Sequence, residues 1–339
     1  MMRIIKYLFI AVIAFLIILY LEHKKPYLIV SGQTFGTYYT IKIRSPKNSK
    51  FIQHIIKEEF TKIDDEMSVF NPHSEISDIN HETSGAWIAL SPELSNLFKN
   101  AHQIYKMSGG AFDPTTGKLI NLWGFGTSGN AQKIPEQSEI DEVLKTTGFD
   151  KIDFDKNYEK LRKKFPETMI NLSAIAKGYA VDRVAELLKK NDYKNFVIEI
   201  GGEVYAHGKR SEDIKGWNIG IVNPENNNEV NAFVITLKNF AAATSGDYRN
   251  FFYIDGKKYS HTIDPKTGYP AENTLTSVTV FDKSCAKADG LATAIMSMGE
   301  KKASAFIKQN NLPVVMFTKD ENGKLESWVS PAAISLGVR

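Results

Sequence analysis

The chain has almost no cysteine and little net charge, and each shortage excludes a class of protein. Its 339 residues include one cysteine, Cys285, which rules out a disulfide framework and a thiolate metal cluster. The net charge of +3 is not gathered into a dense stripe of lysine and arginine, so we expect no nucleic-acid binding. Apolar residues make up 42% and charged residues 24% of the chain, as in a globular protein with a sizeable core.

The longest apolar run lies near the N-terminus, from Tyr7 to Leu21, with Arg3 and Lys6 before it and a charged segment after it. Its length suits a signal-peptide core or a short membrane span. It is followed by bulky residues rather than a small-residue cleavage pattern, and no cysteine nearby offers a lipidation site. We therefore expect residues 1–25 to form an uncleaved anchor in the cell inner membrane and residues 26–339 to form one folded body. Positive charge before the run places that body on the periplasmic side.

Beyond residue 25 the sequence predicts an α/β fold with a mixed sheet. Apolar residues follow helical spacing from Ile52 to Met67 and again from Leu94 to Tyr105. Ser91 and Pro92 supply a cap and a first-turn proline for the second helix. Five further segments have the pattern of strands, at residues 196–200, 217–222, 232–237, 275–280 and 313–317.

One tempting motif is rejected. Residues 124–129 match the G-x-G-x-x-G pattern of dinucleotide-binding folds. That pattern has physical meaning only between a strand and the start of a helix, where the helix end receives a pyrophosphate. Here N-A-Q-K-I-P follows, and no acidic residue closes a βαβ unit. We therefore expect no Rossmann fold.

The segment with the densest chemistry is Y-S-H-T-I-D-P-K-T-G-Y-P at residues 259–270. It joins His261, several hydroxyl groups and the carboxylate of Asp264 to a turn punctuated by proline and glycine, which is how loops usually present reactive groups. Taken alone, the segment equally fits a surface turn whose polar side chains cap local backbone groups.

Three other clusters suit a phosphate-bearing ligand. Small residues surround Lys177, where the backbone can approach a ligand closely and the lysine offers a point charge for phosphate. Asp289 and Thr293 stand four residues apart, so on a helix they share one face and offer hard oxygen ligands for Mg²⁺. Residues 109–126 combine turn-forming glycines with aromatics that can stack on a planar ligand. Each cluster alone also fits an ordinary structural role: a tightly packed helix start, a chance pair, or core.

Together these blocks resemble the ApbE family of periplasmic flavin transferases, which attach FMN from FAD to threonine or serine of acceptor proteins. The resemblance runs from Thr34 to about Gly299, nearly all of the body. Its markers in order are G-A-F-D-P-T-T-G at 110–117, L-W-G-F-G at 122–126, S-A-I-A-K-G-Y at 173–179, E-I-G-G-E at 199–203, S-G-D-Y-R at 245–249, the segment at 259–270, and A-D-G-L-A-T-A at 288–294. Ordered blocks at family-like spacing are far more specific than any one block.

The resemblance implies an ApbE-like fold with a site for FAD as substrate and for Mg²⁺. The positions that line FAD correspond to Phe35, Phe70, Ala111, Phe112, Asp113, Asn171, Lys177 and Ile263. The cation would take the main-chain oxygen of Ala174 and side-chain oxygens of Asp289 and Thr293, with the carbonyl of Ala292 as a further candidate. The family usually has Asp at position 171, Met at position 35, and Tyr or Trp at position 70. Phe70 preserves stacking, whereas Asn171 can donate as well as accept.

The implied reaction is phosphoryl transfer, in which positioning and charge neutralisation matter most. An acceptor hydroxyl is a poor nucleophile at neutral pH, and His261 is our candidate base because the ordinary pKa of histidine lies near working pH. His261 could equally orient phosphate, with Asp264 or a water taking the proton. FAD hydrolysis to FMN and AMP, and a non-catalytic flavin carrier, are the alternatives. The expected partner is an acceptor protein with a Thr or Ser site, such as a subunit of a membrane redox complex.

Overall fold

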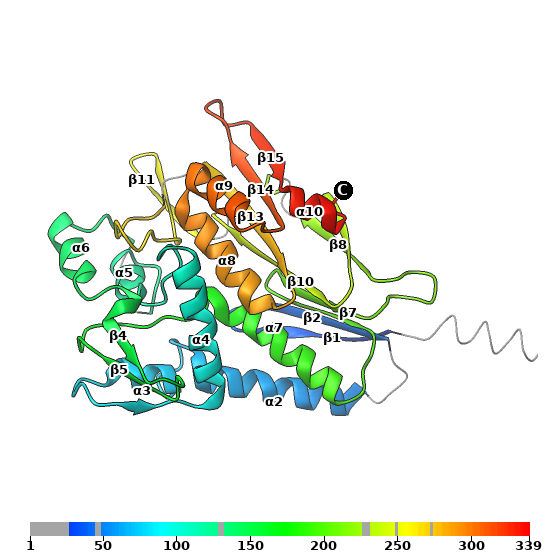
Figure 1. The fold of residues 1–339 in the computed structure, drawn as a ribbon, viewed down its shortest axis with the longest axis horizontal. Helices are drawn as coiled ribbons and strands as arrows, with labels where there is room; N and C mark the ends of the chain where they lie inside the picture. Colours follow the sequence, from blue (N-terminus) through cyan, green and yellow to red (C-terminus); the bar gives the residue numbers. More distant parts are fainter. Residues whose placement is uncertain (1–26, 45–48, 128–131, 226–230, 248–249, 272–273) are drawn as a thin grey trace, which may run out of the picture.

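An eight-stranded sheet forms the centre of the fold in the computed structural model, which describes residues 27–44, 49–127, 132–225, 231–247, 250–271 and 274–339 (Figure 1). The strand order is β1-β2-β6-β7-β10-β13-β14-β15, and each neighbouring pair is antiparallel. The strands are β1 (Tyr27–Thr34), β2 (Thr37–Arg44), β6 (Phe196–Ile200), β7 (Glu203–His207), β10 (Phe240–Gly246), β13 (Leu275–Asp282), β14 (Val314–Lys319) and β15 (Leu325–Val329).

The expected α/β class is confirmed, but the expected mixture of strand directions is not found in this sheet. Period-two patterns reveal strands without revealing their direction. For two of these pairs, tight turns fix the relative direction of the strands, because a two-residue connection can join only antiparallel neighbours. Phe35 and Gly36 connect β1 to β2, and Gly201 and Gly202 connect β6 to β7, all four with positive φ.

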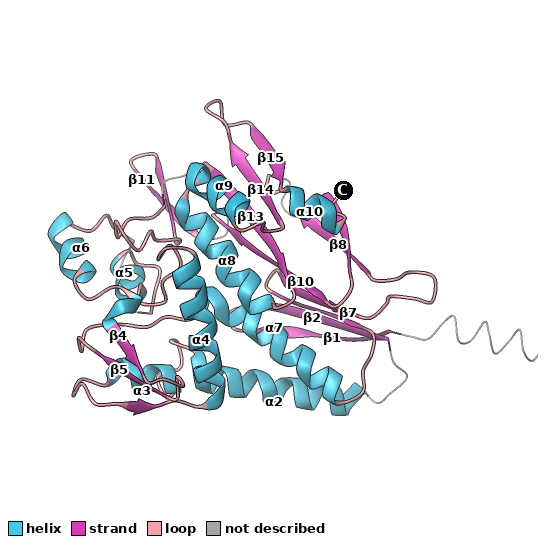
Figure 2. Ribbon diagram, in the orientation of Figure 1, coloured by secondary structure: helices cyan, strands magenta, loops and turns pink. Residues whose placement is uncertain are grey.

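Helices cover one face of the sheet, with α7 (Ser173–Lys190) and α8 (Cys285–Met298) against it and α2 (Ser49–Met67) and α4 (Pro92–Met107) outside them (Figure 2). The predicted helices at α2 and α4 are confirmed, and the Ser91 hydroxyl accepts a hydrogen bond from the Leu94 amide at 3.2 Å. The remaining C-terminal helix of this layer, α9 (Glu300–Gln309), packs on α8.

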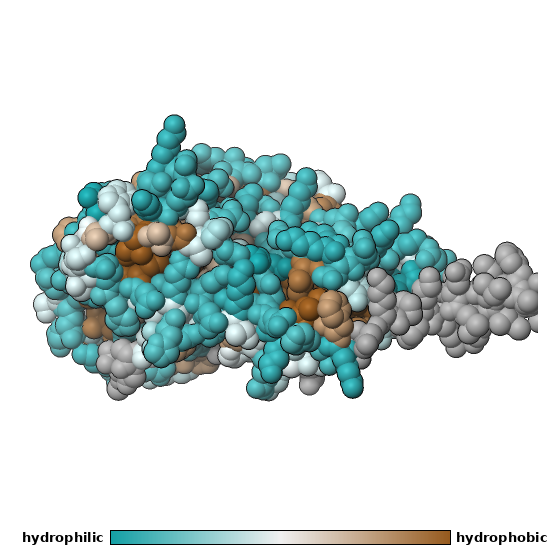
Figure 3. Space-filling model, turned by 90° about the horizontal axis from the view of Figure 1, so that it is seen from below, coloured by the Kyte–Doolittle hydropathy of each residue, from teal (hydrophilic) through white to brown (hydrophobic). Residues whose placement is uncertain are grey.

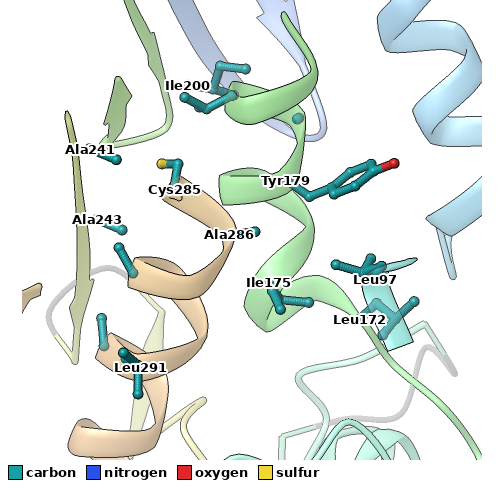
Figure 4. Close-up of a cluster of buried hydrophobic side chains, with 14 of the residues drawn as sticks. Leu97, Leu172, Ile175, Tyr179, Ile200, Ala241, Ala243, Cys285, Ala286 and Leu291 are labelled. Carbon is teal, nitrogen blue, oxygen red and sulfur yellow. The ribbon is translucent and has the colours of Figure 1, made fainter. Parts of the chain in front are cut away.

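The helices α7 and α8 cross at very close range, and this crossing positions the site described below. A Cβ atom on Gly178 would lie only 2.4 Å from the carbonyl oxygen of Cys285, so only glycine allows the approach. In Figure 4, Ala286 of α8 lies between the two helices, Cys285 points toward Ala241 of the sheet, and Tyr179 of α7 points away from α8. Lys177 lies inside α7, in its second turn.

The opposite face of the sheet is covered by a two-stranded ribbon, β8 (Trp217–Val222) with β9 (Asn231–Leu237), and by α10 (Pro331–Leu336). Alternation along β14 shows both coverings: Val314 and Met316 enter the helix-side core, whereas Val315 and Phe317 enter the ribbon-side core. The five strands predicted from the sequence are all present at these positions.

Smaller elements extend one end of the body. They are α3 (Glu75–His81), β3 (Ile88–Ala89), α5 (Gly117–Leu122), α6 (Gln137–Leu144), the 3-10 turn η1 (Phe149–Lys151), β4 (Ile152–Phe154), β5 (Lys160–Lys163), β11 (Phe251–Ile254) and β12 (Lys257–Ser260). The G-x-G-x-x-G segment follows the helix α5 and no strand, which agrees with rejecting a Rossmann fold, although its last two residues lie outside the described ranges.

The predicted anchor, residues 1–25, lies outside the described residues, so the boundary at residue 26 stays a prediction. Within the described ranges, no helix has the length and apolar character needed to cross a membrane. From below, the surface is mostly hydrophilic, with hydrophobic areas that are separated by hydrophilic surface (Figure 3).

Candidate functional site

Two adjoining cavities lie where α5, α7 and the segment after β12 meet. One has a volume of about 330 Å³ and contains charged and hydroxyl groups, and we call it the charged cavity. The other has a volume of about 580 Å³ and contains several phenylalanines, and we call it the aromatic cavity. Their common wall consists of Ile120, Asn171, Ser173, Lys177, Asn250 and His261.

A buried group of three charges forms the floor of the charged cavity. Lys177 of α7 places its Nζ 2.7 Å from Oε1 of Glu203 and 3.9 Å from Oδ1 of Asp289. The second carboxylate oxygen of Asp289 accepts a hydrogen bond from the Gly178 amide at 2.9 Å. Both acids are almost fully buried, at 1% exposure each. The close crossing of α7 and α8 thus brings two helix side chains and the first residue of β7 to one point.

Neighbouring charges and burial shift the pKa values of these three groups in opposite directions. Burial lowers the pKa of Lys177, but the carboxylates of Asp289 and Glu203 outweigh it and raise the pKa above its ordinary value. Burial raises the pKa of Glu203 and of Asp289, and Lys177 opposes the rise in both. The lysine therefore stays charged near neutral pH, whereas burial disfavours the ionised form of the two acids and Lys177 favours it.

The predicted cation ligands lie in one place, with one exception. Asp289 and Thr293 share a face of α8 and line the charged cavity together with Ala174 of α7. The Thr293 hydroxyl lies 3.2 Å from that of Ser245. Ala292 is fully buried and is not among the lining residues of either cavity. In the described part of the chain, no three His, Cys, Asp or Glu residues gather as a metal cluster, so a cation here would depend on a mixed set of carboxylate, hydroxyl and carbonyl oxygens.

His261 stands on the shared wall in a defined tautomer. Its Nδ1 lies 3.1 Å from the carbonyl oxygen of Asn250, and because a carbonyl only accepts, Nδ1 must carry the proton. In the neutral ring Nε2 is then free of a proton and able to accept one. Burial lowers the pKa of His261, with an opposing effect from the Asn250 carbonyl, so the neutral form is favoured near pH 7.

The segment that carries His261 is fixed by the L-W-G-F-G block. Trp123 donates from its indole nitrogen to the carbonyl oxygen of Gly268 at 2.8 Å, and its ring stacks on Tyr259 at 5.5 Å. Asp264 accepts from the Lys266 amide at 2.9 Å within the turn and lines neither cavity. The structure therefore favours His261 over Asp264 as the group that faces a ligand.

The 111–113 segment contributes shape more than charge. Ala111, Phe112, Asp113 and Ile263 all line the charged cavity, as predicted. The Asp113 carboxylate, however, accepts hydrogen bonds from the Thr115 amide, the Thr115 hydroxyl and the Phe149 amide, at 2.8, 2.6 and 3.1 Å. Burial raises the pKa of Asp113 to about 6. Its side chain stabilises the loop, and a ligand would meet the loop mainly through its backbone.

Asn171 ties the same loop to the start of α7. Its backbone amide donates to the Pro114 carbonyl oxygen at 2.7 Å. Its side-chain Oδ1 accepts from the Ser173 backbone amide at 2.9 Å. With Oδ1 occupied, the side chain presents its NH₂ group as a donor to the cavities. An aspartate at this position would present a second acceptor instead.

Turns and loops supply the phenylalanine side chains that line the aromatic cavity. Phe35 occupies the β1–β2 turn at φ +50°, a conformation that bulky residues rarely adopt, and its ring meets Phe60 edge-on at 5.6 Å. Phe70 follows α2 with 70% of its surface exposed. Both line the cavity as predicted. Phe125 lines it too and approaches the His261 ring edge-on at 6.4 Å.

The residues of this site that the sequence did not single out include Phe125, Glu203 and Asn250. Phe125 lay inside the L-W-G-F-G block but was indistinguishable from a core aromatic. Glu203 was the last letter of the E-I-G-G-E block; a lone acid opening an otherwise apolar strand was the available sign of its role. Chemically, the site combines a planar apolar slot, a lysine, two buried acids and a neutral histidine. Such a set suits a ligand with an aromatic ring system and a polyphosphate.

Comparison with known proteins agrees with this geometry. The ApbE family profile matches residues 35–316. An FAD:protein FMN transferase of Vibrio cholerae serotype O1 is 40% identical over 297 residues, covering 87% of this chain and 88% of that protein. One of Haemophilus influenzae is 39% identical and covers 87% of each chain.

Solved structures agree as well. The flavin transferase ApbE from Vibrio cholerae superposes with a TM-score of 0.84 at 37% identity, over 91% of this chain and 99% of that one. The apo form of the Pseudomonas stutzeri flavinyl transferase ApbE gives a TM-score of 0.84 at 32% identity, over 92% and 96%. The chain belongs to the ApbE family.

Proposed function

We propose that this protein is an FAD:protein FMN transferase that joins FMN through a phosphoester bond to a Thr or Ser of an acceptor protein and releases AMP. One observation carries the proposal: an aromatic cavity and a charged cavity share a wall on which Lys177 and His261 both stand. The names of the relatives support the same activity.

FAD as substrate fits the paired cavities. A planar ring system can lie against Phe35, Phe70 and Phe125, where stacking and apolar burial favour it. The pyrophosphate would then lie toward Lys177, whose charge is secured by its two acidic neighbours. The Asn171 NH₂ group stands between the cavities and can donate to a phosphate or ribityl oxygen.

The donor set also fits a divalent cation. Asp289 Oδ1 lies 3.9 Å from Lys177 Nζ, and Asp289 shares the cavity wall with Thr293 and Ala174. These are the hard oxygen ligands that Mg²⁺ prefers. Mg²⁺ held by Asp289, Thr293 and the carbonyl of Ala174 would neutralise charge on the pyrophosphate and on the departing AMP.

His261 would act as the general base. The acceptor hydroxyl oxygen attacks the phosphorus of the FMN half, the bond from that phosphorus to the AMP oxygen breaks, and the hydroxyl proton passes to Nε2 of His261. Lys177 offers its ammonium to a phosphate oxygen while Glu203 holds it from behind. Asn250 keeps the imidazole in the tautomer that this transfer requires.

The location and the partner follow from the sequence and remain part of the proposal. Residues 1–25 would anchor the protein in the inner membrane with the body on the periplasmic side. The acceptor would be a membrane redox-complex subunit with a Thr or Ser site. The anchor lies outside the described residues, and the acceptor is a separate protein.

One assay tests the activity against its alternatives. The purified full-length chain is incubated with FAD, Mg²⁺ and a threonine-bearing acceptor, and covalent flavin fluorescence and AMP are measured. Fluorescent acceptor with equimolar AMP is the expected result. Free FMN with AMP and an unlabelled acceptor would indicate FAD hydrolysis, and bound but intact FAD would indicate a carrier.

A further inference from the structure

One oxygen of the charged cavity, Oε2 of Glu203, has no hydrogen-bond partner among the described residues. Glu203 opens β7 directly after the Gly201–Gly202 turn and is 1% exposed. Its Oε1 accepts from Lys177 at 2.7 Å, but its Oε2 is buried without any hydrogen bond from the described residues. A buried acceptor without a hydrogen bond loses the bonds that it made to water in the unfolded chain, which is unfavourable. An unmet acceptor on the wall of a cavity indicates that a bound group completes it.

The group that completes Oε2 must be a donor. A carboxylate only accepts, and Lys177 already holds the other oxygen. Two acids also face a single lysine in this cavity, so an added positive charge would be favourable there. A cation with its own water ligands satisfies both conditions. Mg²⁺ keeps several waters when bound to proteins, and outer hydrogen-bond partners of a metal site fix its geometry.

We propose that Glu203 is a positioning residue for the divalent cation: its Oε2 accepts a hydrogen bond from a water that the cation carries, while its Oε1 holds Lys177 in place. This inference rests on the cation site of the proposed function. Glu203 thereby couples two positive groups on the same phosphates, since one carboxylate orients both the lysine and the hydrated cation.

Glu203→Gln is a sharp test because it nearly preserves shape. Lys177 requires an acceptor, so the amide oxygen turns toward the lysine and the NH₂ group turns into the cavity. A donor then stands where the water needs an acceptor. The matched control is Glu199→Gln on the same β6–β7 hairpin: Glu199 accepts from the Gly202 amide at 3.1 Å and lines a groove elsewhere, not the charged cavity.

The measurement is binding of Mn²⁺ alone to the full-length chain, followed by electron paramagnetic resonance, without flavin or acceptor. Glu203→Gln should weaken Mn²⁺ binding about 10- to 100-fold, the usual effect of removing an outer partner of a metal site. Glu199→Gln should bind like the wild type. FAD binding in the presence of EDTA should be unchanged in both variants.

Two results would overturn the inference. Wild-type Mn²⁺ affinity in Glu203→Gln would show that Oε2 does not serve the cation. A loss of FAD affinity in EDTA as large as the loss of Mn²⁺ affinity would assign Oε2 to a flavin hydroxyl instead. If Glu203→Gln does not fold, as judged by circular dichroism, Glu203→Asp replaces it, because the shorter side chain withdraws the oxygen and should also weaken Mn²⁺ binding. A wild-type protein that binds Mn²⁺ but transfers no FMN would count against the proposed function alone.

Discussion

The charged and aromatic cavities share a wall but are built in different ways. The charged cavity draws its charged side chains from the interiors of α7 and α8 and from β7, where Asp289 is fixed by the Gly178 amide and Glu203 by Lys177; His261, on the shared wall, comes from the segment after β12 and is held by the Asn250 carbonyl. The aromatic cavity takes its rings from a turn, a loop and a segment after a short helix, at Phe35, Phe70 and Phe125.

This difference matches what each cavity has to do. Displacement at phosphorus loses much of its rate when a charged group moves by about 1 Å, so it requires groups on rigid elements. Stacking tolerates sliding of one ring over another, so loops suffice. We therefore expect substitutions in the charged cavity to reduce the rate and substitutions in the aromatic cavity to reduce FAD affinity.

Asp289→Asn should show the largest effect. The amide oxygen can still accept from Gly178, so the fold is retained, but a charged ligand for the cation is lost. Transfer should slow on the order of 10²–10³-fold, the size expected when a few kcal/mol of charge stabilisation disappears. Raising Mg²⁺ should restore part of the rate in the fluorescence assay.

The control for this prediction is Asp282→Asn. Asp282 pairs with Lys287 at 2.9 Å and lines neither cavity, so its loss should leave the rate unchanged. If the wild type transfers FMN at an undiminished rate in EDTA, the cation assignment is contradicted. The charged cavity would then not act by binding a cation that neutralises phosphate charge.

His261→Ala should have the next largest effect, a loss of about 10²–10⁴-fold in rate with FAD affinity nearly retained. The wild-type rate should fall as the pH drops, because a proton on Nε2 removes the acceptor. Burial lowers the pKa of His261, so this fall should lie below the ordinary histidine pKa of about 6.5. The variant should lack it.

His54→Ala is the matched change for the histidine prediction, since His54 lies on α2, pairs with Glu58 and lines neither of the two cavities. An unchanged rate or an unchanged pH profile in His261→Ala would mean that another group takes the proton. A loss of FAD affinity instead of rate would mean that His261 contributes to FAD binding and not to the reaction.

The same contrast explains what the sequence could predict. α2, α4 and strands such as β6 and β8 have strong periodic patterns, and they were located within a few residues. β10 was missed because its centre is Ala241, Ala242 and Ala243, and alanine has little preference for strands. It is nonetheless a central strand, since its alanines enter the cores on both faces.

Residues that stand out in their blocks, namely His261, Lys177, Asp289 and Thr293, all line the charged cavity, and their roles there stay predictions. The sequence could not show that the Asp113 carboxylate accepts hydrogen bonds from the Thr115 and Phe149 amides, because those contacts depend on how the loop folds. Ala292 was placed near the cation through its carbonyl by family likeness; the residue is fully buried, and that role stays a prediction. Glu203 required knowledge of which oxygen lacks a partner, which no sequence pattern contains.

Phe70→Ala should give the smallest effect and the one that separates the two cavities best. An aromatic contact of this kind is worth about 0.5–1.5 kcal/mol beyond burial, so FAD affinity should fall about 2- to 10-fold. At saturating FAD the transfer rate should stay near wild type, because no group on the charged cavity has moved. Phe51→Ala is the control: Phe51 is 52% exposed near the other end of α2, and its loss should change neither quantity. If Phe70→Ala instead lowers the rate at saturating FAD and leaves affinity intact, the flavin ring contributes to aligning the phosphorus, and the division between a binding cavity and a reacting cavity fails.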